Sequence, residues 1–428
     1  MNKKELAPKH LAHAWVIWIL SALFMFYKYA LEVSPSVMTN ILMSTYQIDA
    51  AQLGSLAASY FYAYLIMQIP AGIFLDRFGP RKITTLAIIA CSIGVFIFSR
   101  SQTLFFASVG RFITGAGASF AAVNCLKLVA NWFPKRRFAF MAGLMMSVGM
   151  LGAVGGQAPL SAFIKDFFWR DALEIIAVVG LIFSAVFFIV VRNSAPGKKE
   201  ANITSTKITL FKSLAEIFKN PQSWYLSIYS GFAFAPVMVF GGLWGVSFIE
   251  EAYEISKAFA SQYLSLIFIG FAVGAPVFGW LSDWLQNRKK VMFWGTLTSS
   301  LCLTMVIYFP HASYYFLTLL LFLFGFTISS FLLCFTMIRE INPLILSATA
   351  IGFMNSFDAL FGSFSDPLTG KILDLYWDGK LVEGARIFSV ATYQKALLFL
   401  PIYLLISLIF LLFIKETNCK DINTNFLS

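Results

Sequence analysis

The first long apolar segment of the chain carries two opposite charges one helical turn apart. Lys28 lies about fourteen residues into this segment, and Glu32 follows four positions later. In a helix this spacing places both side chains on one face. A charge at that depth in a hydrocarbon layer costs roughly 2.5–3.5 kcal/mol on insertion scales, so it should face a cavity or a partner. The alternative is a self-satisfied Lys28–Glu32 pair that only holds the helix in a bundle.

A second cation, Arg111, lies about seven residues into a later apolar segment and is followed by Gly115 and Gly117. We expect Arg111 to reach a depth similar to that of Glu32, which makes an Arg111–Glu32 contact plausible. Two cations beside one anion suit a carboxylate-bearing or zwitterionic solute, because a carboxylate forms charge-assisted hydrogen bonds with lysine or arginine. Protonation of Glu32 would release Arg111 and couple proton binding to solute binding.

Further polar side chains interrupt other apolar segments. Tyr60, Tyr64 and Gln68 form a stripe on one helical face, which indicates either a cavity wall or interhelical hydrogen bonding. In the second half, Asp358 is interpreted as the one acid well inside a span; it could take up a proton or simply be hydrogen-bonded, and Asp366-Pro367 follows. We expect solute contacts from Lys28, Glu32, Tyr60, Tyr64, Arg111, Tyr229 and Asn355, and proton coupling through Glu32, Arg111 and Asp358.

The elements that position these residues are apolar segments long enough to cross a bilayer. The chain is 59% hydrophobic and 12% charged, which is typical of a polytopic membrane protein and not of a soluble one. About 20 apolar residues span the hydrocarbon core as a helix. Twelve such segments are predicted, at about 14–42, 52–75, 82–99, 104–130, 138–163, 171–191, 222–248, 258–281, 290–309, 314–337, 346–373 and 396–415.

A charged motif occurs twice in the chain, at 72–82 and 279–289, and matched positions such as Asp76 and Asp283 are 207 residues apart. This interval divides the chain into two similar halves. Glycines permit tight turns, and the aspartates can cap a helix or pair with nearby cations. We expect a breakable conformational latch between the halves, formed by Gly72, Asp76, Arg77, Gly79, Arg81, Gly279, Asp283 and Arg288.

These patterns predict an all-α membrane protein with twelve transmembrane helices in two pseudo-symmetric six-helix bundles. The expected division is 1–192, a cytoplasmic linker at 193–221, and 222–428. Lysine and arginine are concentrated in the connections on the side of the termini, which places both termini in the cytoplasm. This topology, with no targeting peptide recognised, favours a bacterial inner membrane and explains the formal net charge of +11 without nucleic acid.

Chemistry of other kinds has no support in the sequence. The five cysteines lack the spacing of a metal site or a disulfide framework, and no nucleotide-binding fingerprint, nucleophile–base pair or zinc-protease motif is recognised. We therefore expect no enzyme, no cofactor and no metal. The expected partners are a small-molecule substrate, protons and the lipid bilayer, with a monomeric chain.

The two halves, the paired motifs, Arg111 with its glycines and a glycine-rich segment ending at Pro159 resemble the major facilitator superfamily. This resemblance implies a secondary transporter working by alternating access, with segments 14–42, 104–130, 222–248 and 314–337 lining a central cavity. It also implies that Arg111, at the position of a family arginine often linked to proton coupling, lies at that cavity with Lys28 and Glu32. The tyrosine stripe before Pro70 is similar to a bacterial branch related to lysosomal dipeptide transporters.

The resulting hypothesis is a gradient-driven, probably proton-coupled symporter for a peptide, amino acid, organic acid or siderophore. A drug or metabolite exporter is the alternative, but it would use an apolar cavity with one or two acids. Gln157-Ala158 also interrupts the glycine pattern that is stronger in drug-antiporter branches. A non-transporting membrane sensor is a further alternative, which usually carries a sizeable soluble domain or a long tail.

Overall fold

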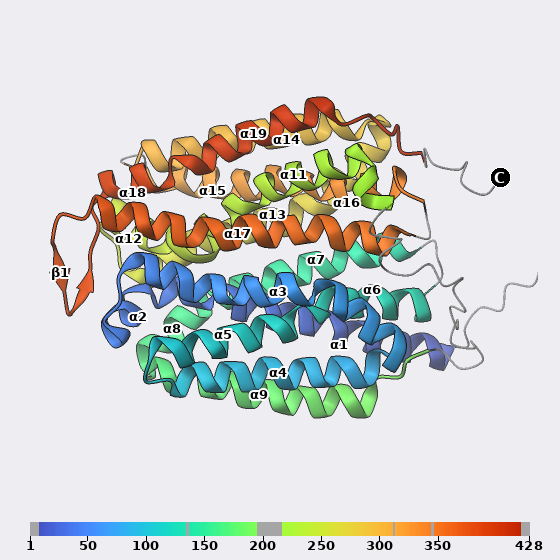
Figure 1. The fold of residues 1–428 in the computed structure, drawn as a ribbon, viewed down its shortest axis with the longest axis horizontal. Coiled ribbons are helices and arrows are strands. Elements are labelled where there is room, and N and C mark those ends of the chain that lie inside the picture. Colours follow the sequence, from blue (N-terminus) through green and yellow to red (C-terminus); the bar gives the residue numbers. More distant parts are fainter. Residues whose placement is uncertain (1–7, 134–136, 195–215, 311–312, 344–345, 421–428) are drawn as a thin grey trace, which may run out of the picture.

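The structure is a computed structural model that describes residues 8–133, 137–194, 216–310, 313–343 and 346–420. Long helices lie side by side in one bundle, as Figure 1 shows. A short β-hairpin lies at one end, called here the hairpin end, and the described chain begins and finishes at the opposite end, called the terminus end. Most of the expected linker, residues 195–215, lies outside the described residues.

In the first half, several expected spans are built from two or three shorter helical pieces. The elements are α1 (Pro8–Val33), η1 (Ser34–Val37), α2 (Thr39–Tyr46), α3 (Ala50–Phe78), α4 (Pro80–Arg100), α5 (Leu104–Ala118), α6 (Phe120–Trp132), α7 (Phe138–Gly155), α8 (Ala158–Asp166) and α9 (Trp169–Val190).

The second half repeats this pattern. Its elements are α11 (Pro221–Pro236), the π-helix η3 (Val237–Trp244), α12 (Gly245–Tyr253), α13 (Lys257–Leu285), α14 (Arg288–Tyr308), α15 (Tyr314–Ile328), η4 (Ser329–Leu332), α16 (Leu333–Glu340), α17 (Ser347–Leu375), β1 (Leu381–Val382), β2 (Ala385–Arg386), α18 (Val390–Leu397) and α19 (Phe399–Phe413). The two strands pair antiparallel, with Leu381 opposite Arg386.

Ten helical stretches of the described residues are long and apolar enough to cross a membrane. The two 29-residue helices α3 and α17 are not among them, although they lie within the bundle and pack along each other. The count of twelve spans therefore stays a prediction.

Helices α3 and α17 come from different halves, and small residues bring their backbones together. A Cβ atom at Gly54 would lie 2.4 Å from the Asp366 carbonyl oxygen, and one at Gly370 would lie 2.1 Å from that of Ala50. Only glycine fits at such distances, as at other close contacts between membrane helices. The two halves are thus in close backbone contact along this pair.

The repeated motif is mostly helical, which corrects the expectation of a loop between apolar runs. Helix α3 continues to Phe78 and α4 begins at Pro80, so only Gly79 separates them. Gly79 has φ +82°, and the matched Gln286 has φ +49°, so both copies turn through a left-handed residue. Gly72 and Gly279 have open space where a Cβ would lie, and neither serves a close helix contact.

Candidate functional site

The two charges of α1 form an ion pair inside the bundle. Lys28 Nζ contacts the Glu32 carboxylate, and the two residues are 5% and 8% exposed. The same ammonium lies 3.6 Å from the centre of the Tyr29 ring and 5.0 Å from that of Tyr64. Ring faces attract cations, so these contacts help to offset the cost of burying Lys28.

Arg111, on α5, contacts the end of α1 and not the Glu32 carboxylate. Its Nη1 donates to the carbonyl of Leu31 at 2.8 Å and its Nη2 to that of Glu32 at 3.3 Å. Pro35 has no N–H to bond the Leu31 carbonyl four residues earlier, and carbonyls in a last helical turn attract cations. The expected side-chain contact is therefore corrected to a main-chain one, because Lys28 occupies the carboxylate.

The predicted stripe on α3 faces these cations. The Arg111 guanidinium lies 4.9 Å from the centre of the Tyr60 ring, and the Tyr60 hydroxyl is buried without a hydrogen-bond partner. The Tyr64 hydroxyl accepts a 3.4 Å bond from Asn355 Nδ2 on α17, which joins the two halves. Gln68 is buried as well. The structure thus brings five of the predicted solute-contact residues into one connected region with Lys28 and Glu32.

A pocket lies between the halves next to this region. Its lining comes from α1, α3 and α7 of the first half and from α11, η3, α13 and α17 of the second. The polar and charged lining residues are Tyr29, Glu32 and Asp366. Aromatic and apolar side chains form most of the wall, among them Phe61, Met150, Phe234, Met238 and Phe268. Segments 104–130 and 314–337 contribute none of the lining residues, which differs from the expected cavity.

Asp366 is the pocket residue that our interpretation of the sequence missed. It is 1% exposed, its Oδ1 has no hydrogen-bond partner, and Arg111 and Glu32 are the charged groups that act on it electrostatically. Treating Asp358 as the one deep acid of this half was therefore wrong. The signal was present in the sequence, because Asp366 interrupts an apolar segment and such acids are functional by default.

Two other predicted residues lie inside the second half, away from the pocket lining. The Asp358 Oδ1 atom accepts a 2.6 Å hydrogen bond from the Ser230 hydroxyl. The Tyr229 hydroxyl bonds the Thr296 hydroxyl at 2.8 Å, and the Tyr229 side chain is fully buried. The geometry gives both side chains partners within their own half and does not bring them together with Glu32.

At the hairpin end, polar contacts join the two halves. The Asp374 carboxylate, at the end of α17, accepts from the backbone N–H groups of Ala50 at 3.1 Å and Ala51 at 2.8 Å. It thereby caps the N-terminus of α3, and Arg386 of the hairpin holds the same carboxylate at 2.7 Å. This cap adds to the one that α3 carries in its own sequence at Asp49.

Two hydroxyls add a second contact between the halves at this end. The Thr39 and Ser247 hydroxyl oxygens are 2.7 Å apart, which links α2 to α12. Lys257 Nζ donates to the Thr39 hydroxyl at 3.4 Å and pairs with Glu250 at 3.5 Å. Both hydroxyl-bearing residues are buried, so opening this end would expose them.

Gln157 makes a third contact of this kind. It lies between α7 and α8, where Pro159 in the first turn of α8 interrupts the helix. Its Nε2 donates to the Gly241 carbonyl in the π-helix η3 at 2.6 Å, and its Oε1 accepts from the Ser265 hydroxyl at 3.4 Å. The residue that interrupts the glycine pattern thus bonds the opposite half, and the Gly241-Gly242 pair expected to bend its helix lies within this π-helix.

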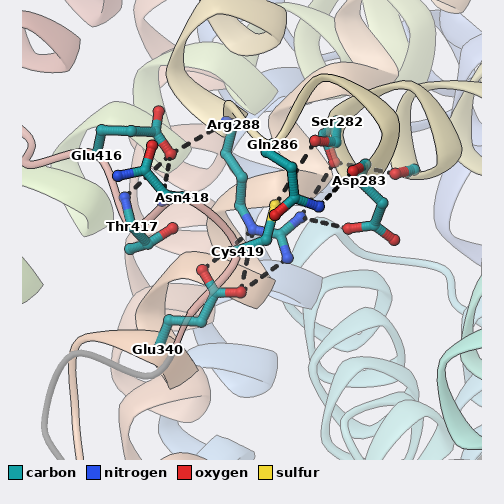
Figure 2. Close-up of polar contacts among 10 residues, drawn as sticks. Ser282, Asp283, Gln286, Arg288, Glu340, Glu416, Thr417, Asn418 and Cys419 are labelled. Carbon is teal, nitrogen blue, oxygen red and sulfur yellow. Dashed lines mark hydrogen bonds and ion pairs between the residues drawn. The ribbon is translucent and has the colours of Figure 1, made fainter.

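At the terminus end, Arg288 of the second motif copy is buried against a glutamate of its own half (Figure 2). Its Nη2 lies 2.7 Å from Glu340 Oε1, and its Nε donates to both carboxylate oxygens at 3.1 Å. Asp283 receives a weaker 3.3 Å contact from Nη1 and is largely exposed. The Glu416 carboxylate caps α14 by accepting from the N–H groups of Arg288 and Lys289.

The first copy is arranged differently. Arg81 Nε donates to the Phe188 carbonyl at 2.7 Å, and its backbone N–H donates to Asn193 Oδ1 at 3.0 Å. Arg77 is exposed beside the Phe78 ring, and the Asp76 side chain lies outside the described part of the structure. The contacts of Arg81 and Arg288 thus stay within their own halves, which corrects the expectation that these arginines bridge the halves in this state.

The comparisons with known proteins agree with this arrangement. The family model of the Major Facilitator Superfamily matches residues 17–365 and 226–424. A hexuronate transporter of Bacillus subtilis is 23% identical over 272 residues, which cover 60% of this chain and 62% of that protein. The lysosomal dipeptide transporter MFSD1 of Danio rerio is 25% identical over 399 residues, 86% of this chain and 82% of that protein. The first bacterial relatives are matched over 62–66% of their length.

A solved structure has the same fold. The crystal structure of a bacterial homolog of the human lysosomal transporter Spinster, in an inward-facing and unoccupied conformation, aligns with a TM-score of 0.77 at 15% identity. The alignment covers 97% of this chain and 98% of that one. With ten apolar helices among its described residues, the chain is a multi-pass membrane protein.

Proposed function

The chain belongs to the Major Facilitator Superfamily, and from this we propose that it is a secondary transporter that moves a small carboxylate-bearing or zwitterionic solute by alternating access. The observation that carries the proposal is the pocket between the halves, which Glu32 and Asp366 line and which Lys28 and Arg111 adjoin through their contacts with α1. Solute sites of such transporters lie at the interface between repeats.

In the proposed binding step, the solute carboxylate displaces Glu32 from Lys28 and forms a charge-assisted bond with the ammonium. A proton on Glu32 removes the charge that holds Lys28, so protonation of this carboxylate favours solute binding. This step replaces the proton-dependent release of Arg111, because Arg111 bonds main-chain carbonyls. Proton coupling through Glu32 is part of the proposal, and Asp358 is a further candidate.

Alternating access requires the halves to rock about the pocket. The contacts of Asp374, Thr39 and Gln157 at the hairpin end would break to open the pocket on that side. The proposal includes the division into 1–192, 193–221 and 222–428, a monomer, and a bacterial inner membrane with cytoplasmic termini. The names of two relatives support the solute class, because a hexuronate carries a carboxylate and a dipeptide is a zwitterion.

One observation favours the exporter as a second candidate. The pocket wall is mainly aromatic and apolar, and its charged lining residues are the acids Glu32 and Asp366. Hydrophobic cations suit such a pocket, because both carboxylates and ring faces attract positive charge. The two candidates differ in their use of Lys28, which a cation would avoid and a carboxylate would bind.

A ligand-stabilisation screen of the purified protein in detergent separates them. The panel holds dipeptides, amino acids, di- and tricarboxylates, sugar acids, sugar phosphates and hydrophobic cations. A ligand at 100 times its Kd stabilises the fold by about 2.7 kcal/mol, which a melting curve detects. We expect one carboxylate-bearing class to stabilise the wild type and to lose this effect in Lys28→Ala.

Lys371→Ala is the matched control, because this lysine is exposed on α17. It should respond to the panel as the wild type does. Stabilisation by hydrophobic cations alone, equal in Lys28→Ala and wild type, would overturn the carboxylate proposal in favour of the exporter. Binding without uptake into proteoliposomes would instead indicate a membrane sensor.

A further inference from the structure

The charges that line the pocket are the acids, while the cations have protein partners. Glu32 and Asp366 belong to the lining and Lys28 and Arg111 do not. Lys28 is paired with Glu32, and two nitrogens of Arg111 donate to carbonyls at the end of α1. A solute that enters the pocket therefore meets carboxylates first.

Asp366 differs from Glu32 because the structure gives it no ion-pair partner. It is 1% exposed and its Oδ1 atom accepts no hydrogen bond. A buried polar atom without a partner costs about 1–3 kcal/mol, and more if it is charged. Such a group in a native structure needs an explanation, and an absent ligand is one. Arg111 Nε, also buried without a partner, is the matching unsatisfied donor.

The backbone around Asp366 is fixed in place. Its carbonyl oxygen lies against Gly54 of α3, where even a Cβ would come within 2.4 Å. Pro367 follows directly and restricts the local backbone further. Asp366 therefore has little freedom to turn toward a protein cation, and it stays at the pocket opposite Glu32 of the other half.

We propose that Asp366 binds the ammonium group of the solute, so that the pocket selects zwitterions with an apolar side chain over carboxylates that lack an amine. This inference rests on the proposed function. An ammonium has three donors, enough to reach Asp366 and Glu32 together. The ring of Tyr29 and the phenylalanines of the wall suit the cation and its apolar side chain.

Charge balance supports the same class. The four ionisable groups Lys28, Glu32, Arg111 and Asp366 sum to no net charge, and a zwitterion adds none. An ammonium that engages Glu32 also weakens its hold on Lys28, which frees Lys28 for the solute carboxylate. A carboxylate without an amine brings an uncompensated negative charge next to Asp366, which is unfavourable in a buried site.

The test measures binding to the purified full-length protein by calorimetry. The probes are L-alanyl-L-leucine and L-leucine, each with an N-acetylated form that lacks the ammonium and an amidated form that lacks the carboxylate. We expect N-acetylation to weaken binding at least tenfold, about 1.4 kcal/mol. In Asp366→Asn this preference for the free amine should disappear, and Asp366→Glu should retain it. Melting curves and size-exclusion profiles verify that both variants fold.

Equal binding of free and N-acetylated probes to the wild type would overturn the inference without any variant. So would a preference for the free amine that persists in folded Asp366→Asn. If amine-free carboxylates bind, are lost in Lys28→Ala and are unaffected by Asp366→Asn, carboxylate transport stands and the ammonium site falls. If hydrophobic amines without a carboxylate bind and only Asp366→Asn removes them, the zwitterion class is wrong. Absence of binding by every carboxylate and amine tested would count against both proposals.

Discussion

The two ends of the molecule use their polar side chains in different ways. At the hairpin end, Asp374, Thr39 and Gln157 each bond a group of the opposite half. At the terminus end, Arg81 and Arg288 of the repeated motif bond groups of their own half. The hairpin-end contacts therefore depend on how the halves are placed, while those of the two arginines depend on each half alone.

This difference indicates which contacts change in a transport cycle. Rigid halves that rock about a pocket keep their internal pairs and exchange the contacts between them. Arg288 should then contribute to the stability of the second half in every state. Asp374 and Gln157 should instead bias the equilibrium between states in which the hairpin end is closed or open.

The largest effect is expected for Arg288→Ala. This change leaves the Glu340 carboxylate buried without its partner, which typically costs about 3–5 kcal/mol. Thermal unfolding in detergent measures the loss. Arg81→Ala, at the matched position of the first copy, removes one bond to a carbonyl and should cost only about 1 kcal/mol. Similar losses for the two variants would contradict the contrast between the two copies.

A smaller, state-dependent effect is expected for Asp374→Ala. Removing this cap should shift the equilibrium toward an open hairpin end by about 1–2 kcal/mol, a factor of roughly five to thirty. Amide hydrogen exchange at Ala50 and Ala51 should accelerate accordingly, because their N–H groups lose the carboxylate. Asp378→Ala is the control, since Asp378 bonds Lys380 within its own loop. Unchanged exchange in Asp374→Ala would mean that the cap does not hold the halves together.

The smallest effect is expected for Gln157→Leu, which removes the bond to the Gly241 carbonyl and costs about 1 kcal/mol. A cysteine placed at Ser247 should then react severalfold faster with a polar maleimide. Gln222→Leu is the matched control, because Gln222 bonds Phe413 and Lys415 within the second half. Equal reactivity in the two variants would show that Gln157 has no role in closing this end.

Much of the fold could be predicted because membrane helices are recorded locally in the sequence. The segment expected at 290–309 is helix 288–308, and that expected at 52–75 is helix 50–78. The ion pair of Lys28 and Glu32 was also predictable, since both residues lie on one helical turn. Local spacing fixes such features before any tertiary contact forms.

The rest of the site depends on which helices meet, and spacing does not record this. Arg111 bonds main-chain carbonyls that Pro35 helps to free, so its partner depends on how α5 meets the end of α1. Asp366 reaches the pocket because Gly54 lets α17 approach α3. The contact of Gln157 with Gly241 joins residues 84 positions apart in the sequence. A single sequence gives each residue type without its tertiary partner.

The most direct measurement uses Thr39→Cys/Ser247→Cys, because the two wild-type hydroxyl oxygens are 2.7 Å apart across the hairpin end. Uptake into proteoliposomes is measured with the solute found in the binding screen, before and after oxidation and again after reduction. Alternating access predicts that the disulfide abolishes uptake and that reduction restores it, with both single-cysteine variants unaffected. Uptake at the wild-type rate by fully cross-linked protein would contradict transport through opening of this end.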